Sequence, residues 1–192
     1  MTECLTILLS PKGVKNMDGI IENSLFLLAE KLGGVILYYP KKSIGKTVCR
    51  DFIIKEFSDR YPVNYFCKRY NLTPEEVKHI LVNEIHEKKY IDRVKETFFI
   101  FLQGLTESKV DNAIELAEKM VLVICEYSDG IQMYIPNLKT LKMKLRNKKI
   151  IQCFNGSNIE CLCREFELTQ ARIYEILRKD RQRRQAILRQ QA

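Results

Sequence analysis

The side chains with the clearest chemical use lie near the end of the chain, in the stretch LTQARIYEILRKDRQRRQ at 168–185. Ile173, Ile176 and Leu177 recur at the i, i+3, i+4 spacing of a helix, so they form one inward-facing apolar stripe. The opposite face then carries hydroxyl, amide and guanidinium groups. These groups bind phosphates and the edges of DNA bases. The pattern therefore favours a helix that binds nucleic acid.

The positions along this face suit different parts of a duplex. Gln170 and Arg172 near the helix start could reach base edges, whereas Arg178 and Lys179 suit phosphates. Thr169 caps the helix and could offer its hydroxyl to a phosphate at the positive helix end. The full set of candidate DNA-binding residues is Ser157, Asn158, Thr169, Gln170, Ala171, Arg172, Tyr174, Glu175, Arg178, Lys179, Arg181, Arg183 and Arg184. The alternative is an ordinary amphipathic helix in which Glu175 pairs with Lys179.

The charge distribution along the chain supports the same interpretation. The net charge is +8, yet residues 97–136 contain 2 basic and 6 acidic side chains. Residues 137–192 contain 14 basic and 5 acidic side chains. A basic excess confined to one end indicates a polyanionic partner, most often nucleic acid. A solvated charged face is the alternative.

Residues 32–81 and 128–177 resemble each other. The matches include Gly34 with Gly130, Tyr38 with Tyr134 and Pro40 with Pro136, at a constant offset of 96. Phe57 is expected to match Phe154, with one extra residue in the first copy, in a turn-rich stretch where an insertion costs little. Two similar units in one chain can form an internal pseudo-two-fold.

Each copy predicts the same order of elements. A helix is expected at 18–32 and again at 107–128, and the two helices are expected to pack together. A strand follows at 35–39 and at 131–135, because β-branched and aromatic residues precede a proline. The economical partner for each strand is the other strand, in an antiparallel ribbon. A further helix is expected between the copies at 85–102, ending at Gly104, with an apolar side formed by Ile91, Val94, Phe98 and Phe101.

The second copy then predicts three helices in close succession. The first covers 141–154. Ser157 or Asn158 caps the second, Ile159–Phe166, and Thr169 caps the third, from Gln170 onward. Two short helices joined by a tight turn are typical of a helix-turn-helix.

The expected fold is therefore mainly α, with two tandem helix-strand-(helix-turn-helix) units that are related by a pseudo-two-fold and share a two-stranded antiparallel ribbon. The expected divisions are an N-terminal arm at 1–17, a first unit at 18–90, a connecting helix at 91–106, a second unit at 107–180 and a basic tail at 181–192.

The sequence FNGSNIECLCREFELTQARIYEIL, preceded by a Gly-x-x-x-Tyr-x-Pro strand, resembles the Mor/C family of phage transcription activators. The resemblance covers about residues 107–180 well and 18–82 more loosely. It implies a dimeric DNA-binding protein, in which a helical and strand region forms the dimer and a C-terminal helix-turn-helix binds the major groove. The family pattern has one such unit per chain, whereas this chain has two.

The first helix-turn-helix differs from the second in charge. Its outward positions hold Glu75, Glu76, Lys78, His79, Val82 and Asn83. Carboxylates at the start of the helix would repel phosphates at close range. We therefore expect this copy to have lost DNA contact, which leaves its surface for a protein partner. The alternative is a backbone contact through Lys68 and Arg69.

Other functional classes lack support in the sequence. No Ser-His-Asp, Cys-His or phosphate-loop pattern is present, so we expect neither an enzyme nor a cofactor. The seven cysteines lack C-x-x-C spacing, which predicts no metal site and favours buried or half-buried thiols in a reducing cytoplasm. No apolar run is long enough to span a membrane, so a cytoplasmic protein is expected. The resemblance to phage activators implies a bacterial or phage origin.

The sequence thus predicts a sequence-specific regulator of transcription that binds double-stranded DNA, with a homodimer expected on DNA. A protein–protein adaptor is the alternative, in which the acidic first helix-turn-helix docks RNA polymerase or another regulator. RNA binding is disfavoured, because no aromatic platform is visible.

Overall fold

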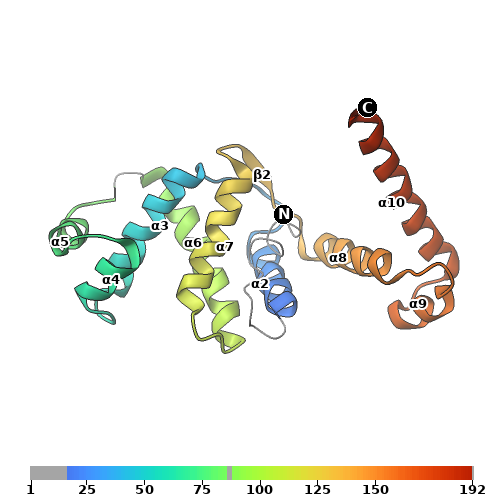
Figure 1. Ribbon diagram of the computed structural model, residues 1–192, viewed down its shortest axis with the longest axis horizontal. Helices are drawn as coiled ribbons and strands as arrows, with labels where there is room; N and C mark the ends of the chain where they lie inside the picture. Colours follow the sequence, from blue (N-terminus) through green and yellow to red (C-terminus); the bar gives the residue numbers. More distant parts are fainter. Residues whose placement is uncertain (1–16, 86–87, 192) are drawn as a thin grey trace. The chain divides into compact units, whose positions relative to one another are not determined.

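The computed structural model describes residues 17–85 and 88–191, which divide into two compact units between Asn137 and Leu138 (Figure 1). The N-terminal unit contains α2 (Met17–Leu32), β1 (Ile36–Tyr38), α3 (Lys42–Phe57), α4 (Val63–Tyr70), α5 (Pro74–Val82), α6 (Lys88–Glu107), α7 (Ala113–Ser128) and β2 (Gln132–Tyr134). The C-terminal unit contains α8 (Leu138–Cys153), α9 (Ile159–Phe166) and α10 (Gln170–Gln191). The predicted mainly helical fold with one two-stranded sheet is confirmed.

The two strands pair with each other, as the sequence predicts. They are antiparallel, and Leu37 lies opposite Met133 at the centre of the register. The ribbon continues beyond the strands, where the Gly34 amide donates to the Ile135 carbonyl at 2.8 Å. Leu37 and Met133 are buried, whereas their neighbours Ile36 and Tyr134 point outward. A strand that alternates in this way covers the core with one face only.

Helix α6 is the central element of the N-terminal unit. It packs against α2, α3 and α7. The side predicted to be apolar is buried, with Val94, Phe98 and Phe101 fully enclosed. The Phe98 ring meets Phe52 of α3 edge to face, with ring centroids 5.0 Å apart. Burial of such large aromatic side chains supplies much of the stability of a small domain.

The position of α6 corrects two predictions. The helices α2 and α7 do not form a packed pair in the part of the chain that the structure describes, because each packs mainly on α6. Gly104 does not end α6, which continues to Glu107. A Cβ at Gly104 would lie 3.0 Å from Leu27 and 3.1 Å from the Ser24 hydroxyl of α2. This glycine therefore allows a close approach of α6 to α2. Because α6 continues to Glu107, the next helix, α7, begins only at Ala113, later than the predicted 107.

The elements recur at one interval along the chain. The bounds of α2, β1, α3 and α4, increased by 96, are the bounds of α7, β2, α8 and α9. Helices α5 and α10 also begin 96 residues apart but differ in length. The predicted one-residue slip is therefore wrong: α3 ends at Phe57 and α8 at Cys153, so Phe154 corresponds to Ser58. The alignment of Phe57 with Phe154 by residue type therefore placed the end of α8 one residue too late.

The C-terminal unit has a small core of its own. Its buried members come from all three helices and are Ile150, Ile159, Leu162, Ile173, Ile176 and Leu177. Half-buried side chains, including Phe154, Cys163 and Leu168, pack around them. The apolar stripe predicted for α10 therefore faces inward, and it fixes which side of α10 meets solvent.

Candidate nucleic-acid interface

A tight turn connects α9 to α10. Glu167 adopts the left-handed conformation with φ of 52°, and its amide donates to the Cys163 carbonyl. The Leu168 amide donates to the same carbonyl at 3.1 Å. This pattern satisfies the last carbonyls of α9 and turns the chain sharply. Asn71 takes the same conformation, with φ of 53°, between α4 and α5.

Of the two N-terminal caps predicted for α9 and α10, the cap of α10 is confirmed and the cap of α9 is not. Thr169 caps α10 as predicted, because its hydroxyl accepts from the Arg172 amide at 3.3 Å. The predicted side-chain cap of α9 by Ser157 or Asn158 is wrong. Asn158 occupies the N-cap position but makes no capping bond. Its side chain instead accepts from the Asn155 amide at 3.1 Å and donates to the Cys153 carbonyl at 2.9 Å.

Asn155 organises the loop before α9. Its side-chain oxygen accepts from the amides of Ser157 and Asn158, each at 3.1 Å. Gly156, between Asn155 and Ser157, has φ of 102°, a backbone conformation that residues with a side chain rarely adopt. Ser157 is exposed and Asn158 half-buried. The loop is thus held by its own polar groups.

The predicted outward face of α10 is open to solvent. Thr169, Gln170, Ala171, Tyr174, Arg178 and Lys179 are exposed, and Arg172 and Glu175 are half-buried. Tyr174 is 51% exposed. The structure therefore gathers these candidates on one side of a single helix.

Glu175 links two of the basic candidates. Its carboxylate lies 2.5 Å from Arg172 Nη1 and 2.8 Å from Lys179 Nζ. The hydrogen bonds from Lys179 and Arg172 hold the pKa of Glu175 below its ordinary value. The Glu175–Lys179 pair of the alternative interpretation is thus present. All three side chains are still partly open to solvent, where ion pairs contribute little to stability, so the cations remain able to exchange Glu175 for another anion.

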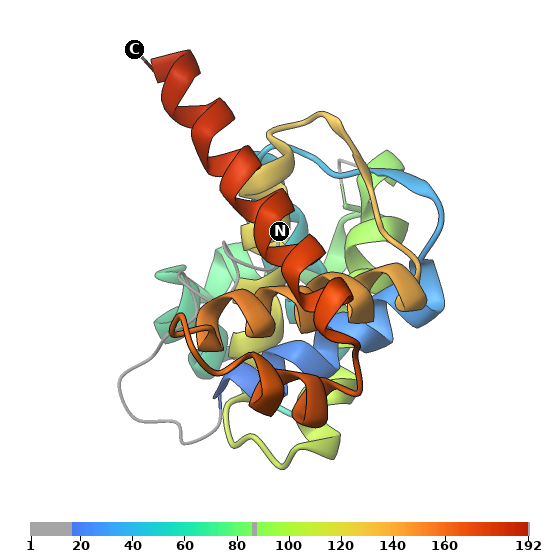
Figure 2. The ribbon, with the colours of Figure 1, turned by 90° about the vertical axis from the view of Figure 1, so that its right-hand side faces the viewer.

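Helix α10 continues well beyond the core of its unit, and Figure 2 shows it projecting past α8 and α9. We call residues 181–191 the extension. Every side chain described in it, up to Arg189, is exposed. Arg184 Nε lies 2.7 Å from the Asp180 carboxylate, one turn away. The predicted basic tail is thus a helix that continues from the candidate DNA-binding face.

The first helix-turn-helix presents a different surface. Thr73 and Glu76 form a capping box at the start of α5, in which the Thr73 amide donates to Glu76 at 2.7 Å. The backbone and hydroxyl hydrogen bonds from Thr73 lower the pKa of Glu76. Glu75 and His79 are exposed beside it. A carboxylate therefore stands at the start of this helix, where Arg172 stands in the second.

Arg69, one of the two residues considered for a backbone contact by the first copy, is already occupied. Its guanidinium lies 2.5 Å from the Glu118 carboxylate of α7 and donates to the Tyr65 hydroxyl at 2.9 Å. Tyr70 donates to the same carboxylate at 3.2 Å. Burial disfavours the charge of Arg69, but the hydrogen bond to Glu118 more than compensates, so the pKa of Arg69 is raised.

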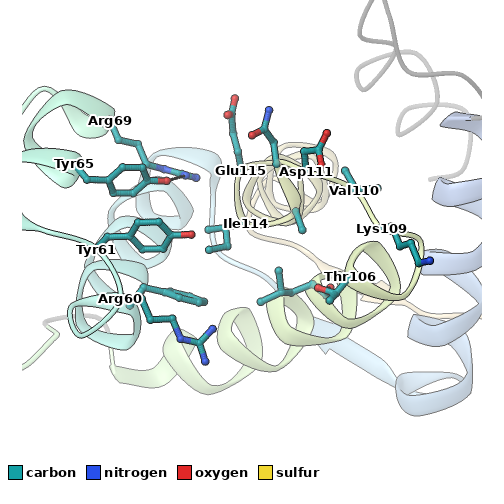
Figure 3. Close-up of a pocket in the computed structure, with 14 residues that line it drawn as sticks. Arg60, Tyr61, Tyr65, Arg69, Thr106, Lys109, Val110, Asp111, Ile114 and Glu115 are labelled. Carbon is teal, nitrogen blue, oxygen red and sulfur yellow. Dashed lines mark hydrogen bonds between the residues drawn. The ribbon is translucent and has the colours of Figure 1, made fainter.

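This contact, which we call the Arg69–Glu118 clamp, joins α4 to α7. The side chains of its two members are only 14% and 13% exposed. It borders a cavity of about 600 Å³, and Figure 3 shows Arg69 beside Tyr65 at the edge. Sequence reasoning missed Glu118, because the two partners are 49 residues apart and no local pattern connects them.

The structure adds further observations on other classes of function and on the cysteines. Within 17–85 and 88–191, no three His, Cys, Asp or Glu side chains gather as metal ligands, and His86 lies outside these residues. None of the helices in the same residues has the length and apolar character needed to cross a membrane. Cys153 and Cys161 are exposed, which corrects the expectation of buried thiols for these two.

The geometry of α9, the left-handed turn and α10 defines a helix-turn-helix unit. A profile of the Mor transcription activator family matches residues 88–192. The late transcription activator C of Escherichia phage Mu is 32% identical over 95 residues, which cover 50% of this chain and 68% of that protein. The Mu-like prophage FluMu protein C of Haemophilus influenzae is 36% identical over 58 residues, covering 30% of this chain and 81% of that protein.

The chain therefore belongs to the Mor transcription activator family, which is a family of transcription activators and not a class of enzymes. The resemblance of residues 107–180 to this family is confirmed. None of the solved structures matches the chain significantly.

Proposed function

We propose that this protein activates transcription by binding a specific site in double-stranded DNA, with the first turns of α10 in the major groove. The observation that carries the proposal is the outward face of α10 in a self-contained helix-turn-helix unit. Its apolar stripe is enclosed by α8 and α9, so the polar and basic side chains of the opposite face are directed toward solvent, where a ligand can reach them.

The positions along α10 suggest a division of roles. Gln170 and Arg172 lie in the first turn, where a recognition helix approaches base edges. Ala171 is small and suits contact with a thymine methyl group. Arg178, Lys179, Arg181, Arg183 and Arg184 follow toward the C-terminal end and suit phosphates.

Five further side chains act beside these. The hydroxyls of Thr169 and Ser157, with the amide side chain of Asn158, stand at helix starts and suit phosphate contact. Tyr174 offers an exposed ring and hydroxyl on the same face. Glu175 orients Arg172 before DNA arrives.

Salt dependence of binding tests the proposal. Each phosphate contact with a cation releases counterions, so the affinity for a random duplex is expected to fall with a log–log slope of about −0.9 per contact. Fluorescence anisotropy with a labelled duplex at several salt concentrations measures this slope. A slope near zero would exclude groove binding and favour an adaptor. A genome-wide footprint of the tagged protein would then identify the specific site.

Arg172→Ala is expected to weaken binding to the specific site by about 1–3 kcal/mol, the value of a bidentate arginine–guanine contact. Arg178→Ala should weaken binding to all sequences, because Arg178 is placed for a phosphate. Neither should unfold the chain, since both side chains lie off the buried stripe. Lys109→Ala, an exposed cation of the N-terminal unit, is the matched control. Unchanged affinity in both arginine variants would rule out α10 as the reading helix.

We further propose that the chain contains two Mor-like units, at 18–90 and 107–180, with a connecting helix at 91–106. The constant offset of 96 residues between the bounds of their elements supports this. The ribbon register adds support, because Leu37 pairs with Met133, its own counterpart at that offset. A local two-fold axis between two antiparallel strands brings each central residue opposite the equivalent residue of the other strand. In this proposal one chain mimics a dimer, and a palindromic site requires two chains.

The first helix-turn-helix is then a protein-docking surface and not a DNA reader. Its acidic helix start and the engaged Arg69 favour this second role. RNA polymerase or another regulator is the candidate partner. Reversal of the charge of Glu75 should then reduce activation without a change in DNA affinity, which a reporter assay and an anisotropy titration distinguish.

A further inference from the structure

The cavity beside the Arg69–Glu118 clamp has the size of a small-molecule site. Its volume of about 600 Å³ falls within the range of about 300–1,000 Å³ that is usual for ligand pockets. It lies between α4, the end of α6 and the start of α7, all within the N-terminal unit. None of its lining residues belongs to α5 or α10. The cavity is therefore separate from the acidic start of α5 and from the candidate DNA-binding face.

One wall of the cavity consists of aromatic rings and guanidinium groups. The rings of Tyr61 and Tyr65 stack with their centroids 4.4 Å apart and their planes inclined by 19°. Figure 3 shows the two rings beside Arg69, with their hydroxyls directed toward the start of α7. The edge of an aromatic ring is electropositive and packs favourably on the face of a second ring. This wall therefore suits the flat face of an aromatic ligand.

The facing wall is aliphatic. Leu102 of α6, Val110 of the connection and Ile114 of α7 all line the cavity, and each is only half-buried. A flat apolar body placed between the two walls would remove these three side chains from water, which is favourable in proportion to the apolar area covered. The two walls together favour a ligand with an aromatic body.

Arg60 supplies a charge that is free to bind a ligand. It is exposed, and its guanidinium lies over the ring of Phe57, 5.7 Å from the ring centroid. In the part of the chain that the structure describes, Arg60 makes no ion pair, whereas Arg69 is held by Glu118. A guanidinium binds a carboxylate or phosphate through two parallel hydrogen bonds. Arg60 therefore favours an anionic group on the ligand.

The other charges that line the cavity do not oppose an anion at Arg60. Lys109 and Asp111 carry opposite charges, and Glu115 is already paired along α7. Figure 3 shows Asp111 and Glu115 across the cavity from Arg60. Asn112, at the N-cap of α7, makes no side-chain capping bond, so the positive end of this helix also borders the cavity.

The aromatic and cationic wall is not required by the helix-turn-helix itself. At the offset of 96 residues, its free arginine and its two tyrosines are replaced by Gly156, Ser157 and Cys161. Helix α9 nevertheless has bounds that correspond to those of α4, and the same left-handed turn follows both helices. Folding of the motif therefore does not account for these three side chains.

We propose that this cavity binds a small organic anion with a flat aromatic body, either an aromatic phosphate such as a nucleoside monophosphate or an aromatic carboxylate. The aromatic body lies between the tyrosine edges and the aliphatic wall, and the anionic group pairs with Arg60. This function goes beyond the proposed binding of DNA and does not depend on it. A bound ligand holds α4 to α6 and α7, and it stabilises the N-terminal unit because the unfolded chain lacks the site.

A titration of the full chain followed by NMR amide chemical shifts gives both the affinity and the location of the ligand. Adenosine monophosphate and adenosine share one flat body and differ by the phosphate. The monophosphate should bind with a dissociation constant between about 10 µM and 1 mM, which is the range for a ligand of about 23 non-hydrogen atoms at ordinary or lower efficiency. Adenosine should bind at least about 10-fold more weakly, because it lacks the charge-assisted hydrogen bonds.

A second pair of probes distinguishes a carboxylate from a phosphate. Para-hydroxyphenylacetate is an aromatic carboxylate, and tyrosol is its neutral alcohol counterpart. Preference for the acid over its neutral counterpart in either pair supports the proposal and identifies the anionic group. Equal affinity for the acid and the neutral compound in both pairs would overturn it.

Arg60→Gln tests the charge contact. This variant should bind the preferred acid about 10-fold more weakly than wild type and should bind the neutral counterpart equally well. Arg93→Gln, the same change on α6 away from the cavity, is the matched control and should behave like wild type. Equal weakening of the acid and the neutral compound by Arg60→Gln would exclude the proposed ion pair.

The shifted amides test the location. They should lie within 57–69 and 102–115, and Thr106→Trp should abolish binding of all four probes because it fills the cavity. Gln103→Trp, at an exposed position of α6 that does not line the cavity, is the control for this variant. Shifts confined to α10 would place the anion on the candidate DNA-binding face and overturn the proposal. Failure of every probe, in a chain whose affinity for duplex DNA keeps its salt dependence, would remove this inference and leave the proposed function in place.

Discussion

Deletion of residues 181–192 is expected to weaken binding to every duplex and to flatten its dependence on salt. The deletion removes four arginines, Arg181, Arg183, Arg184 and Arg189, and no acidic residue. If all four contact phosphate, the log–log salt slope falls in magnitude by about 3.6. Between 50 mM and 200 mM salt, wild type then loses roughly 150-fold more affinity than the truncated chain. Anisotropy titrations on short duplexes measure both slopes.

The variant with Ile187→Ser and Leu188→Ser is the control for the truncation, because it alters the same helical turns without a change in charge. It should keep the wild-type slope on a random duplex. The truncated chain should also keep its preference for the specific site, since Gln170 and Arg172 are untouched. Retained affinity with lost sequence preference would contradict the division between reading and phosphate contacts.

Glu118→Ala is expected to destabilise the N-terminal unit by about 3 kcal/mol, the lower end of the range for removing one partner of a buried ion pair. The lower end applies because the two side chains are still 13–14% exposed. The pKa of Arg69 is raised and a guanidinium does not lose its proton, so the variant leaves a charge in a half-enclosed site. Hydrogen exchange measured by mass spectrometry should show faster opening of α4 and α7.

Glu115→Ala is the matched control for this change. Glu115 belongs to the same helix and pairs with Lys119 at 2.6 Å, but the two side chains are 49% and 58% exposed. An exposed pair one turn apart contributes a few tenths of a kcal/mol. Equal effects of the two variants would show that the Arg69–Glu118 clamp contributes no more than a surface pair.

The features predicted well from the sequence are those that depend on near neighbours. The bounds of α9, the Thr169 cap and the buried stripe at Ile173 follow from caps, turn residues and helical periodicity, all within a few residues of one another. The pairing of β1 with β2 is a long-range feature, yet similarity between the two strands was enough to predict it.

The features that were missed depend on the choice of distant partners. The apolar face of α6 was predicted, but the periodicity of a helix does not show which elements pack on it, and in the structure α6 lies against both α2 and α7. The Arg69–Glu118 pair and the Tyr39–Thr97 hydrogen bond, at 2.8 Å, join residues 49 and 58 positions apart. The C-terminal end of α10 was not predicted either, because its last turns contain no buried apolar residues whose helical spacing would indicate where the helix stops.

The constant interval of 96 residues has a genetic consequence. In an assembly of identical chains every substitution appears at both related positions, so neither copy of a surface can change alone. In the two-unit arrangement that we propose, the related positions are separate codons, and Glu76 and Arg172 stand where identical chains would require the same residue. A carboxylate at the start of one helix therefore places no constraint on the guanidinium at the start of the other. Each surface is free to be selected for its own partner.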